Sequence, residues 1–161
     1  MKVFTKIKEL QEYLADQKHP IGLVPTMGAL HQGHLSLIEH SKKENATTVV
    51  SIFVNPVQFN DKKDFDKYPR LLDDDLNLLE TYNCDVVFAP SVDEMYPEPP
   101  KESYDFGYLD KILEGAYRPG HFNGVAIVVN RLFHIIKPDR AYFGKKDYQQ
   151  YIIIKELVKQ Q

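Results

Sequence analysis

The segment TTVVSIFVN, from Thr47 to Asn55, is the feature that most restricts the fold of this chain. It is rich in β-branched residues and almost continuously apolar, instead of alternating between apolar and polar positions. Such a strand is typical of a parallel sheet, in which helices cover both faces. The shorter run IGLVPT, over residues 21–26, also indicates a buried strand. The two segments together predict an α/β protein.

Segments with a helical spacing of apolar residues lie around these strands. We expect Thr5 to cap a first helix whose inner stripe is Ile7, Leu10 and Leu14. Further helices are predicted from Leu35 to about Asn45 and over 71–82, 124–136 and 148–158, and further strands over 85–90 and 140–144. The proline-rich stretch 91–103 is expected to be a surface excursion. Alternating strands and helices favour a doubly wound, mostly parallel, Rossmann-like sheet.

Composition narrows the class of protein further. The chain has 161 residues, of which 43% are hydrophobic and 27% charged, with a formal net charge of −3, as expected for one globular domain without a nucleic-acid or membrane partner. The single cysteine, Cys84, excludes an internal disulfide and favours a cytoplasmic location, and we expect it to pack or to take no part in function. No apolar run approaches the roughly 20 residues that span a bilayer.

Unusual polar residues follow three of the predicted strands. His31 and His34 come after the first strand, Asn55 and Gln58 after the second, and GKKD, over residues 144–147, after the fourth. Ligands of doubly wound sheets bind at the carboxyl ends of the strands, where the strand order reverses. The sequence therefore predicts one ligand site to which these loops contribute.

The first of these loops has the composition of a phosphate site. Gly28 and Gly33 permit turns and a close approach of a ligand to the main chain. A helix that begins near Gly33 would direct unpaired N–H groups and its positive dipole end toward the loop. His31 and His34 could donate hydrogen bonds to phosphate oxygens and stabilise the charge that develops as pyrophosphate leaves.

Other interpretations of these residues stay open. The two histidines could be solvated helix caps, or, with His40 nearby, part of a metal site, although no cysteine or acidic cluster completes one. Gln58 could hold a hydroxy acid or only contact solvent. Lys145 or Lys146 could provide charge to a phosphate, and Asp147 could cap a helix or accept from a ribose hydroxyl.

Two further groups of residues carry no clear function by themselves. The acidic run Asp73, Asp74 and Asp75 places negative charge at a helix start; a magnesium ligand among the three stays open, although their spacing does not indicate one. RPGHF, over residues 118–122, brings an arginine and a histidine into a predicted turn.

Five motifs, taken in order, resemble the pantoate–β-alanine ligase (pantothenate synthetase) family of the nucleotidyltransferase superfamily. They are PTMGALHQGH, VSIFVNPVQF, YPR with DDDL, EGAYRPGHFNGVAIVV and KPDRAYFGKKDYQQ, which extend from about Val24 to the end of the chain. His-x-Gly-His alone points only to the superfamily, whereas NPVQF and FGKKDYQQ are narrower marks. The resemblance implies that ATP and (R)-pantoate give pantoyl adenylate and pyrophosphate. β-Alanine then attacks the acyl group, releasing pantothenate and AMP, with Mg²⁺ accompanying the nucleotide.

The resemblance also implies roles for individual residues. His34 would be the proton donor, with His31 and Lys146 as the other catalytic groups. The implied ATP site is Met27, Gly28, Ala29, Leu30, His31, Gln32, Gly33, His34, Gly144, Lys145, Lys146 and Asp147. The implied pantoate site is Pro25, Thr26, Met27, Asn55, Gln58 and Gln150, with Gln58 also at the β-alanine position. Asp74 would contact magnesium.

The family has a second, smaller domain with a Met-Ser-Ser-Arg-like motif that closes over the phosphates, and no such motif is found in this sequence. We therefore expect residues 1–161 to form the N-terminal Rossmann-like domain without its lid, with weak ligand binding and little or no turnover. The family also implies a homodimer. The alternatives are a cytidylyltransferase-like enzyme and a non-catalytic module that binds nucleotide or self-associates.

Overall fold

A five-stranded, entirely parallel sheet forms the centre of this computed structural model, which describes residues 1–103 and 121–144. The strands are β1 (Lys2–Phe4), β2 (Ile21–Thr26), β3 (Thr47–Ile52), β4 (Val86–Phe88) and β5 (Arg140–Ala141), in the spatial order β1-β4-β3-β2-β5. The β2–β3 register places Leu23 opposite Val49. The predicted fold class is confirmed.

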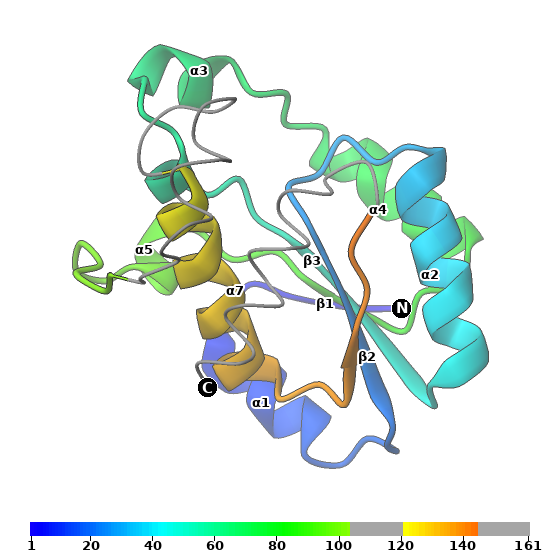
Figure 1. Cartoon of the computed structure of the whole chain (residues 1–161). Coiled ribbons are helices and arrows are strands. Elements are labelled where there is room, and N and C mark those ends of the chain that lie inside the picture. Colours follow the sequence, from blue (N-terminus) through cyan, green and yellow to red (C-terminus); the bar gives the residue numbers. More distant parts are fainter. Residues whose placement is uncertain (104–120, 145–161) are drawn as a thin grey trace, which may run out of the picture.

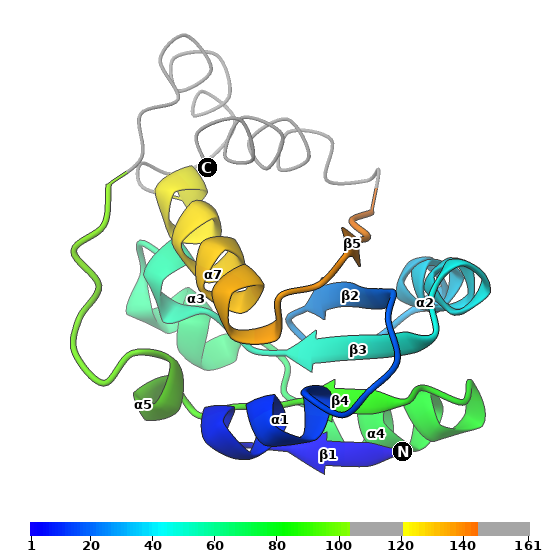
Figure 2. The ribbon, with the colours of Figure 1, turned by 90° about the horizontal axis from the view of Figure 1, so that it is seen from below.

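Helices cover both faces of the sheet (Figure 2). Helices α1 (Ile7–Leu14) and α7 (His121–Ile136) pack on one face, and α2 (Gln32–Glu44) and α4 (Leu72–Thr81) pack on the other. Three short helical turns are η1 (Pro56–Gln58), α3 (Lys62–Lys67) and α5 (Val92–Met95). Figure 1 shows α3 beyond the carboxyl ends of the central strands.

The apolar runs in the sequence are explained by this double coverage. Successive strand residues point to opposite faces, so both sets are buried. The residues beneath α1 and α7 include Leu23, Val49 and Val86, and those beneath α2 and α4 include Val24, Val50 and Val87. All of these side chains are completely buried.

The start of the chain differs from the prediction. Residues 2–4 form the edge strand β1, which sequence reasoning missed because a strand of three residues with Val3 exposed has no clear apolar pattern. Thr5 does not cap α1; the N-cap position is Lys6, and its side chain makes no cap hydrogen bond. The carboxylate of Glu94 accepts from the Ile7 amide at 2.7 Å instead, so the cap comes from a distant segment.

Other predicted elements are confirmed with shifted ends. Strand β3 ends at Ile52, not Asn55, and α7 begins at His121, so that residue lies in a helix and not in a turn. The stretch 91–103 is only partly a surface excursion, because Met95 and Tyr96 are buried in the core. Leu72, the first residue of α4, is exposed. The predicted helix 148–158 lies outside the described residues.

The strand order reverses at β2. From β2 the chain passes to β3 and then β4 on one side, and α7 returns it to β5 on the other side of β2. The carboxyl ends of β2 and β5 therefore flank the reversal, where doubly wound sheets bind ligands. Among the described residues, no helix has the length and apolar character that crossing a bilayer requires.

Candidate active site

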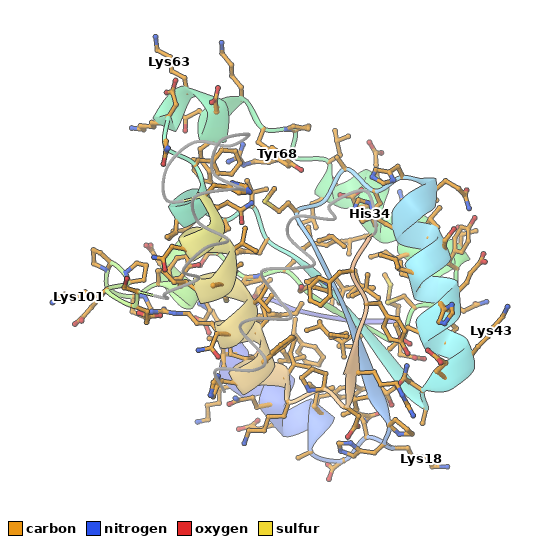
Figure 3. All side chains as sticks on the ribbon, in the orientation of Figure 1. Lys18, His34, Lys43, Lys63, Tyr68 and Lys101 are labelled. Carbon is orange, nitrogen blue, oxygen red and sulfur yellow. The ribbon has the colours of Figure 1, made fainter. Side chains whose placement is uncertain are left out.

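The predicted site residues that the structure describes lie at the carboxyl edge of the sheet. Figure 3 shows His34 at the first turn of α2 and Tyr68 at the same edge, whereas Lys18 lies at the opposite edge. Asn55 and Gln58 follow β3, and Gly144 lies just after β5. The loops after β2, β3 and β5, which the sequence analysis assigned to one ligand site, therefore leave the sheet at one edge.

The loop after β2 begins with two consecutive left-handed residues, Gly28 at φ 82° and Ala29 at φ 51°. Glycine is favoured at residue 28 because a Cβ would be strained by the left-handed backbone and would also lie 3.0 Å from Oδ2 of Asp75. The Thr26 hydroxyl donates to the Ser51 carbonyl at 2.9 Å and accepts from the Gly28 amide at 3.1 Å. The loop is thus fixed to the end of the sheet.

His31 and His34 cap helix α2 reciprocally. Nδ1 of His31 accepts from the Gly33 amide at 3.1 Å, and Nδ1 of His34 accepts from the His31 amide at 3.2 Å. Their ring centroids are 4.1 Å apart. A neutral imidazole that accepts through Nδ1 carries its proton on Nε2, so Nε2 is the donor atom of each ring in this arrangement. The capping interpretation is confirmed, and it is compatible with donation from Nε2 to a ligand.

The expectation of unpaired main-chain amides in this loop is wrong for most of its residues. The amides of Gly28, Ala29, Leu30, His31 and Gly33 all donate to side chains of this chain. Phosphate binding by those amides would require these hydrogen bonds to break. The imidazole rings are therefore better placed than the main chain to donate to a phosphate.

Asp75 is the acceptor for two of those amides. Its Oδ2 accepts from Ala29 and its Oδ1 from Leu30, each at 2.9 Å, and the residue is only 3% exposed. The neighbouring residue Asp74, to which the family resemblance gives a magnesium contact, is exposed. Sequence reasoning missed Asp75, although its position four residues before the buried Leu79 places both on the inner face of α4.

The loop after β3 is held in the interior. Asn55, 1% exposed, donates from Nδ2 to Gln58 Oε1 at 3.1 Å and to the Gly124 carbonyl at 3.0 Å. Its Oδ1 accepts from the Tyr96 hydroxyl at 2.7 Å and the Val57 amide at 3.3 Å. Asn55 thus anchors the loop and fixes the orientation of the Gln58 amide.

A cavity of about 270 Å³ opens at the carboxyl ends of β2, β3 and β4. Its polar lining includes the side chains of Arg70 and Asp75. The guanidinium of Arg70 donates to the Tyr68 carbonyl at 2.7 Å and stacks on the Phe65 ring at 4.7 Å. The remaining lining residues are Met27, Gly28, Ile52, Phe53, Val54, Phe65, Leu71, Leu72, Ala89, Pro90, Ser91 and Val92.

The remaining predictions have mixed outcomes. Cys84 packs in the core as expected, at 3% exposed, and burial raises the pKa of its thiol to about 11. Within residues 1–103 and 121–144, no three histidine, cysteine, aspartate or glutamate side chains are grouped to hold a metal ion. Lys145, Lys146, Asp147 and Gln150 lie outside the described residues, so their roles stay predictions.

The all-parallel sheet, the reversal at β2 and the histidine pair beside it define a doubly wound α/β protein of the class that binds ligands at the carboxyl edge of its sheet. The sequence model of the Pantoate-beta-alanine ligase family matches residues 2–161. The chain belongs to this family.

Curated relatives agree with the family match. The chain is 57% identical over 163 residues to a pantothenate synthetase of Bacteroides fragilis. The aligned region covers 99% of this chain and 58% of that protein. It is 54% identical to a pantothenate synthetase of Staphylococcus epidermidis, with 98% of this chain and 56% of that protein covered. The chain therefore spans somewhat over half the length of the curated relatives that it matches.

Solved structures show the same fold. A pantoate-beta-alanine ligase from Francisella tularensis, complexed with beta-gamma ATP and beta-alanine, superposes with a TM-score of 0.93 at 45% identity, covering 99% of this chain and 62% of that one. A pantothenate synthetase from Thermus thermophilus superposes with a TM-score of 0.91 at 46% identity, covering 99% of this chain and 58% of that one.

Proposed function

We propose that this chain forms the nucleotide- and pantoate-binding part of a pantoate–β-alanine ligase. In this reaction the pantoate carboxylate attacks the α-phosphate of ATP, which gives pantoyl adenylate and pyrophosphate. The amine of β-alanine then attacks the acyl carbon, which gives pantothenate and releases AMP. Adenylation is needed because a carboxylate would otherwise have to expel oxide, a very poor leaving group at neutral pH.

The observation that carries this proposal is the reciprocally capped pair His31 and His34, at the start of α2 and beside the reversal of strand order. Each ring directs its Nδ1 at the main chain, so its Nε2–H is the donor for a ligand. Donors held in place before the reaction stabilise charge that develops on a departing pyrophosphate without reorganising. His34, as the proton donor, and Lys146 would add to this stabilisation.

Residues of the neighbouring loops would hold the other substrates. We assign pantoate to Gln58 and Gln150 and the end of β2, with Asn55 acting indirectly by orienting the Gln58 amide. Gln58 would also border the β-alanine position. Support comes from the Francisella tularensis relative, which is described with beta-gamma ATP and beta-alanine bound.

Mg²⁺ would accompany the nucleotide and neutralise part of the phosphate charge. The exposed carboxylate of Asp74, in the first turn of α4, has the oxygen chemistry that Mg²⁺ prefers and would contact it. Asp75 is unsuited to that contact in its present arrangement, since both of its carboxylate oxygens accept from the main chain.

Calorimetric titration of the chain with ATP, CTP and pantoate, each with Mg²⁺, tests the proposal. We expect weak binding of ATP and pantoate by this chain with little exchange of labelled pyrophosphate into ATP, and pantoate-dependent exchange in a full-length form that carries the lid domain. Preferential binding of CTP would favour a cytidylyltransferase, and nucleotide binding without exchange in the full-length form would favour a non-catalytic module. Light scattering on the same samples would report the proposed homodimer.

In a full-length form, the substitution His34→Ala is expected to leave the fold intact and to lower pyrophosphate exchange at least about 100-fold, because general acid catalysis by a positioned side chain is typically worth that much. The matched control is His40→Ala, which removes an exposed imidazole from the same helix, outside the loop of residues 27–34 and paired with Glu44 at 3.4 Å. Near-normal exchange in the His34 variant would remove this residue from the mechanism.

A further inference from the structure

We propose that Asp75 is a positioning residue that sets the shape of the nucleotide loop, residues 27–34, by holding its main-chain amides. This inference rests on the proposed function, because it assigns the loop to ATP. It gives the acidic run a role other than magnesium binding or a favourable interaction with the helix dipole.

The loop needs an external restraint. Gly28 and Ala29 are consecutive left-handed residues, and the left-handed conformation is costly for alanine because its Cβ approaches the following carbonyl. Such conformations persist where the surrounding structure fixes them, and they are concentrated at ligand sites. The two hydrogen bonds from Ala29 and Leu30 to one carboxylate supply that restraint.

The carboxylate is itself well held. Asp75 lies in the first turn of α4, where the partial positive charge of the helix end favours an anion. Its own amide donates to the Leu71 carbonyl at 2.8 Å, so the helix fixes its main chain. At 3% exposed, the side chain is largely shielded from solvent, and hydrogen bonds to a charged acceptor are stronger there than in water.

The restraint has a direct consequence for the histidines. Leu30, held by Oδ1 of Asp75, immediately precedes His31, whose amide donates to His34. The position at which the chain enters α2 therefore depends on Asp75, and so does the direction in which both imidazole rings present Nε2–H. Loss of the carboxylate should misplace the phosphate donors and leave the loop after β3 unchanged.

The substitution Asp75→Asn tests this role, because it keeps the size of the side chain but replaces one acceptor oxygen with an NH₂ group. The amide of Ala29 or of Leu30 would then face the new NH₂ group, which is itself a donor, and would lose its hydrogen bond. We expect the affinity for ATP to fall at least about tenfold, from the loss of a hydrogen bond to a charged group, and the affinity for pantoate to change less than about twofold. If Asp75 only stabilised the fold, the substitution would lower the affinities for ATP and for pantoate alike. Asp73→Asn, an exposed residue of the same run, is the charge-matched control and should bind ATP like the wild type.

Amide resonances give an independent measurement on the wild-type chain. The proposal expects the Ala29 and Leu30 amides to exchange slowly with solvent and to keep their chemical shifts at saturating ATP, while the imidazole resonances of His31 and His34 move. If ATP shifts those two amides most strongly, phosphate has replaced Asp75 and the proposal is wrong. An Asp75→Asn chain that folds and binds ATP within about twofold of wild type would also overturn it.

The wild-type titration separates this inference from the proposed function. A wild-type chain that binds no ATP refutes the proposed function and the nucleotide part of the inference. The exchange rates of the two amides then still decide whether Asp75 holds the loop. ATP binding in the wild type that Asp75→Asn leaves intact refutes the inference alone.

Discussion

The loops that follow β2 and β3 leave neighbouring strands at the same edge of the sheet, but different forces hold them. The β2 loop is fixed by hydrogen bonds from its amides to Thr26, Asp75, His31 and His34, and it contains left-handed backbone. The β3 loop is fixed by the buried amide of Asn55 and by direct packing of η1 on α7.

This difference predicts that changes in the two loops will affect the stability of the fold to different extents. The histidines of the β2 loop are exposed or half-buried, so a change there should alter the site with little effect on the core. The β3 loop packs against α7, which supplies a large part of the core on one face, so a change there should weaken the whole fold. The predictions below test that division, from the largest expected effect on stability to the smallest.

The substitution Gly124→Ala should have the largest effect. A Cβ at residue 124 would lie 2.6 Å from Gln58 Cα and 2.7 Å from the Val57 carbonyl oxygen, and these are main-chain atoms that cannot swing aside. We expect the free energy of unfolding to fall by at least about 2 kcal/mol, because overpacking a rigid contact outweighs the gain in helix propensity. Urea unfolding followed by circular dichroism measures this change.

Gly144→Ala is the matched control for that experiment. A Cβ at residue 144 would meet no atom of residues 1–103 or 121–144 within 4 Å, and we expect the unfolding free energy of this variant to stay within about 0.5 kcal/mol of wild type. If Gly124→Ala were equally harmless, the β3 loop would not be fixed by close packing, and the contrast between the loops would fail.

The substitution Tyr96→Phe should have an intermediate effect. It removes the hydroxyl that donates to Asn55 Oδ1 at 2.7 Å, so we expect a loss of about 1–2 kcal/mol at neutral pH. Chemical denaturation at neutral pH measures this loss, and a wild-type value would show that the hydroxyl does not support the β3 loop.

The same residue predicts a dependence on pH. Burial raises the pKa of Tyr96 above its ordinary value, an effect that Arg131 partly offsets. The unfolded chain would lose this proton near the ordinary value of about 10 while the folded chain keeps it. The stabilising contribution is therefore complete below that pH and is lost as pH rises above it. Unfolding measured from about pH 9 to pH 11 should decline less steeply in Tyr96→Phe than in wild type; equal slopes would contradict the assignment.

The two loops also differ in how far the sequence could predict them. Strand β3 was predictable because its apolar run is long and rich in β-branched residues. Composition alone left 124–136 open between helix and strand, and its length and apolar spacing favoured the helix that the structure shows. The placement of the candidate site residues at the carboxyl edge followed from the rule for parallel sheets, and both histidines could be assigned to a helix start. The contact between Gly124 and Gln58 joins residues far apart in sequence, so no local pattern contains it.

The acidic run shows why the details of the site were harder to predict. Asp74 and Asp75 are identical in type and adjacent, and only the rotation of α4 decides that Asp75 is buried while Asp74 is exposed. The same limit explains the missed cap of α1, because the Glu94 carboxylate reaches the Ile7 amide across 87 residues of sequence. Tertiary contacts, not local propensity, determine both features.

The substitution Ala29→Gly should have the smallest effect on stability, and it separates two explanations of the shape of the β2 loop. Glycine removes the cost of a left-handed alanine but increases the freedom of the unfolded chain by a similar amount, so we expect a change within about 0.5 kcal/mol. The amide of residue 29 is retained, and so is its bond to Asp75. ATP affinity, measured by calorimetry, should therefore match wild type. If this variant bound ATP as weakly as Asp75→Asn, the stiffness of Ala29 would position the loop, and the carboxylate would not be sufficient to do so.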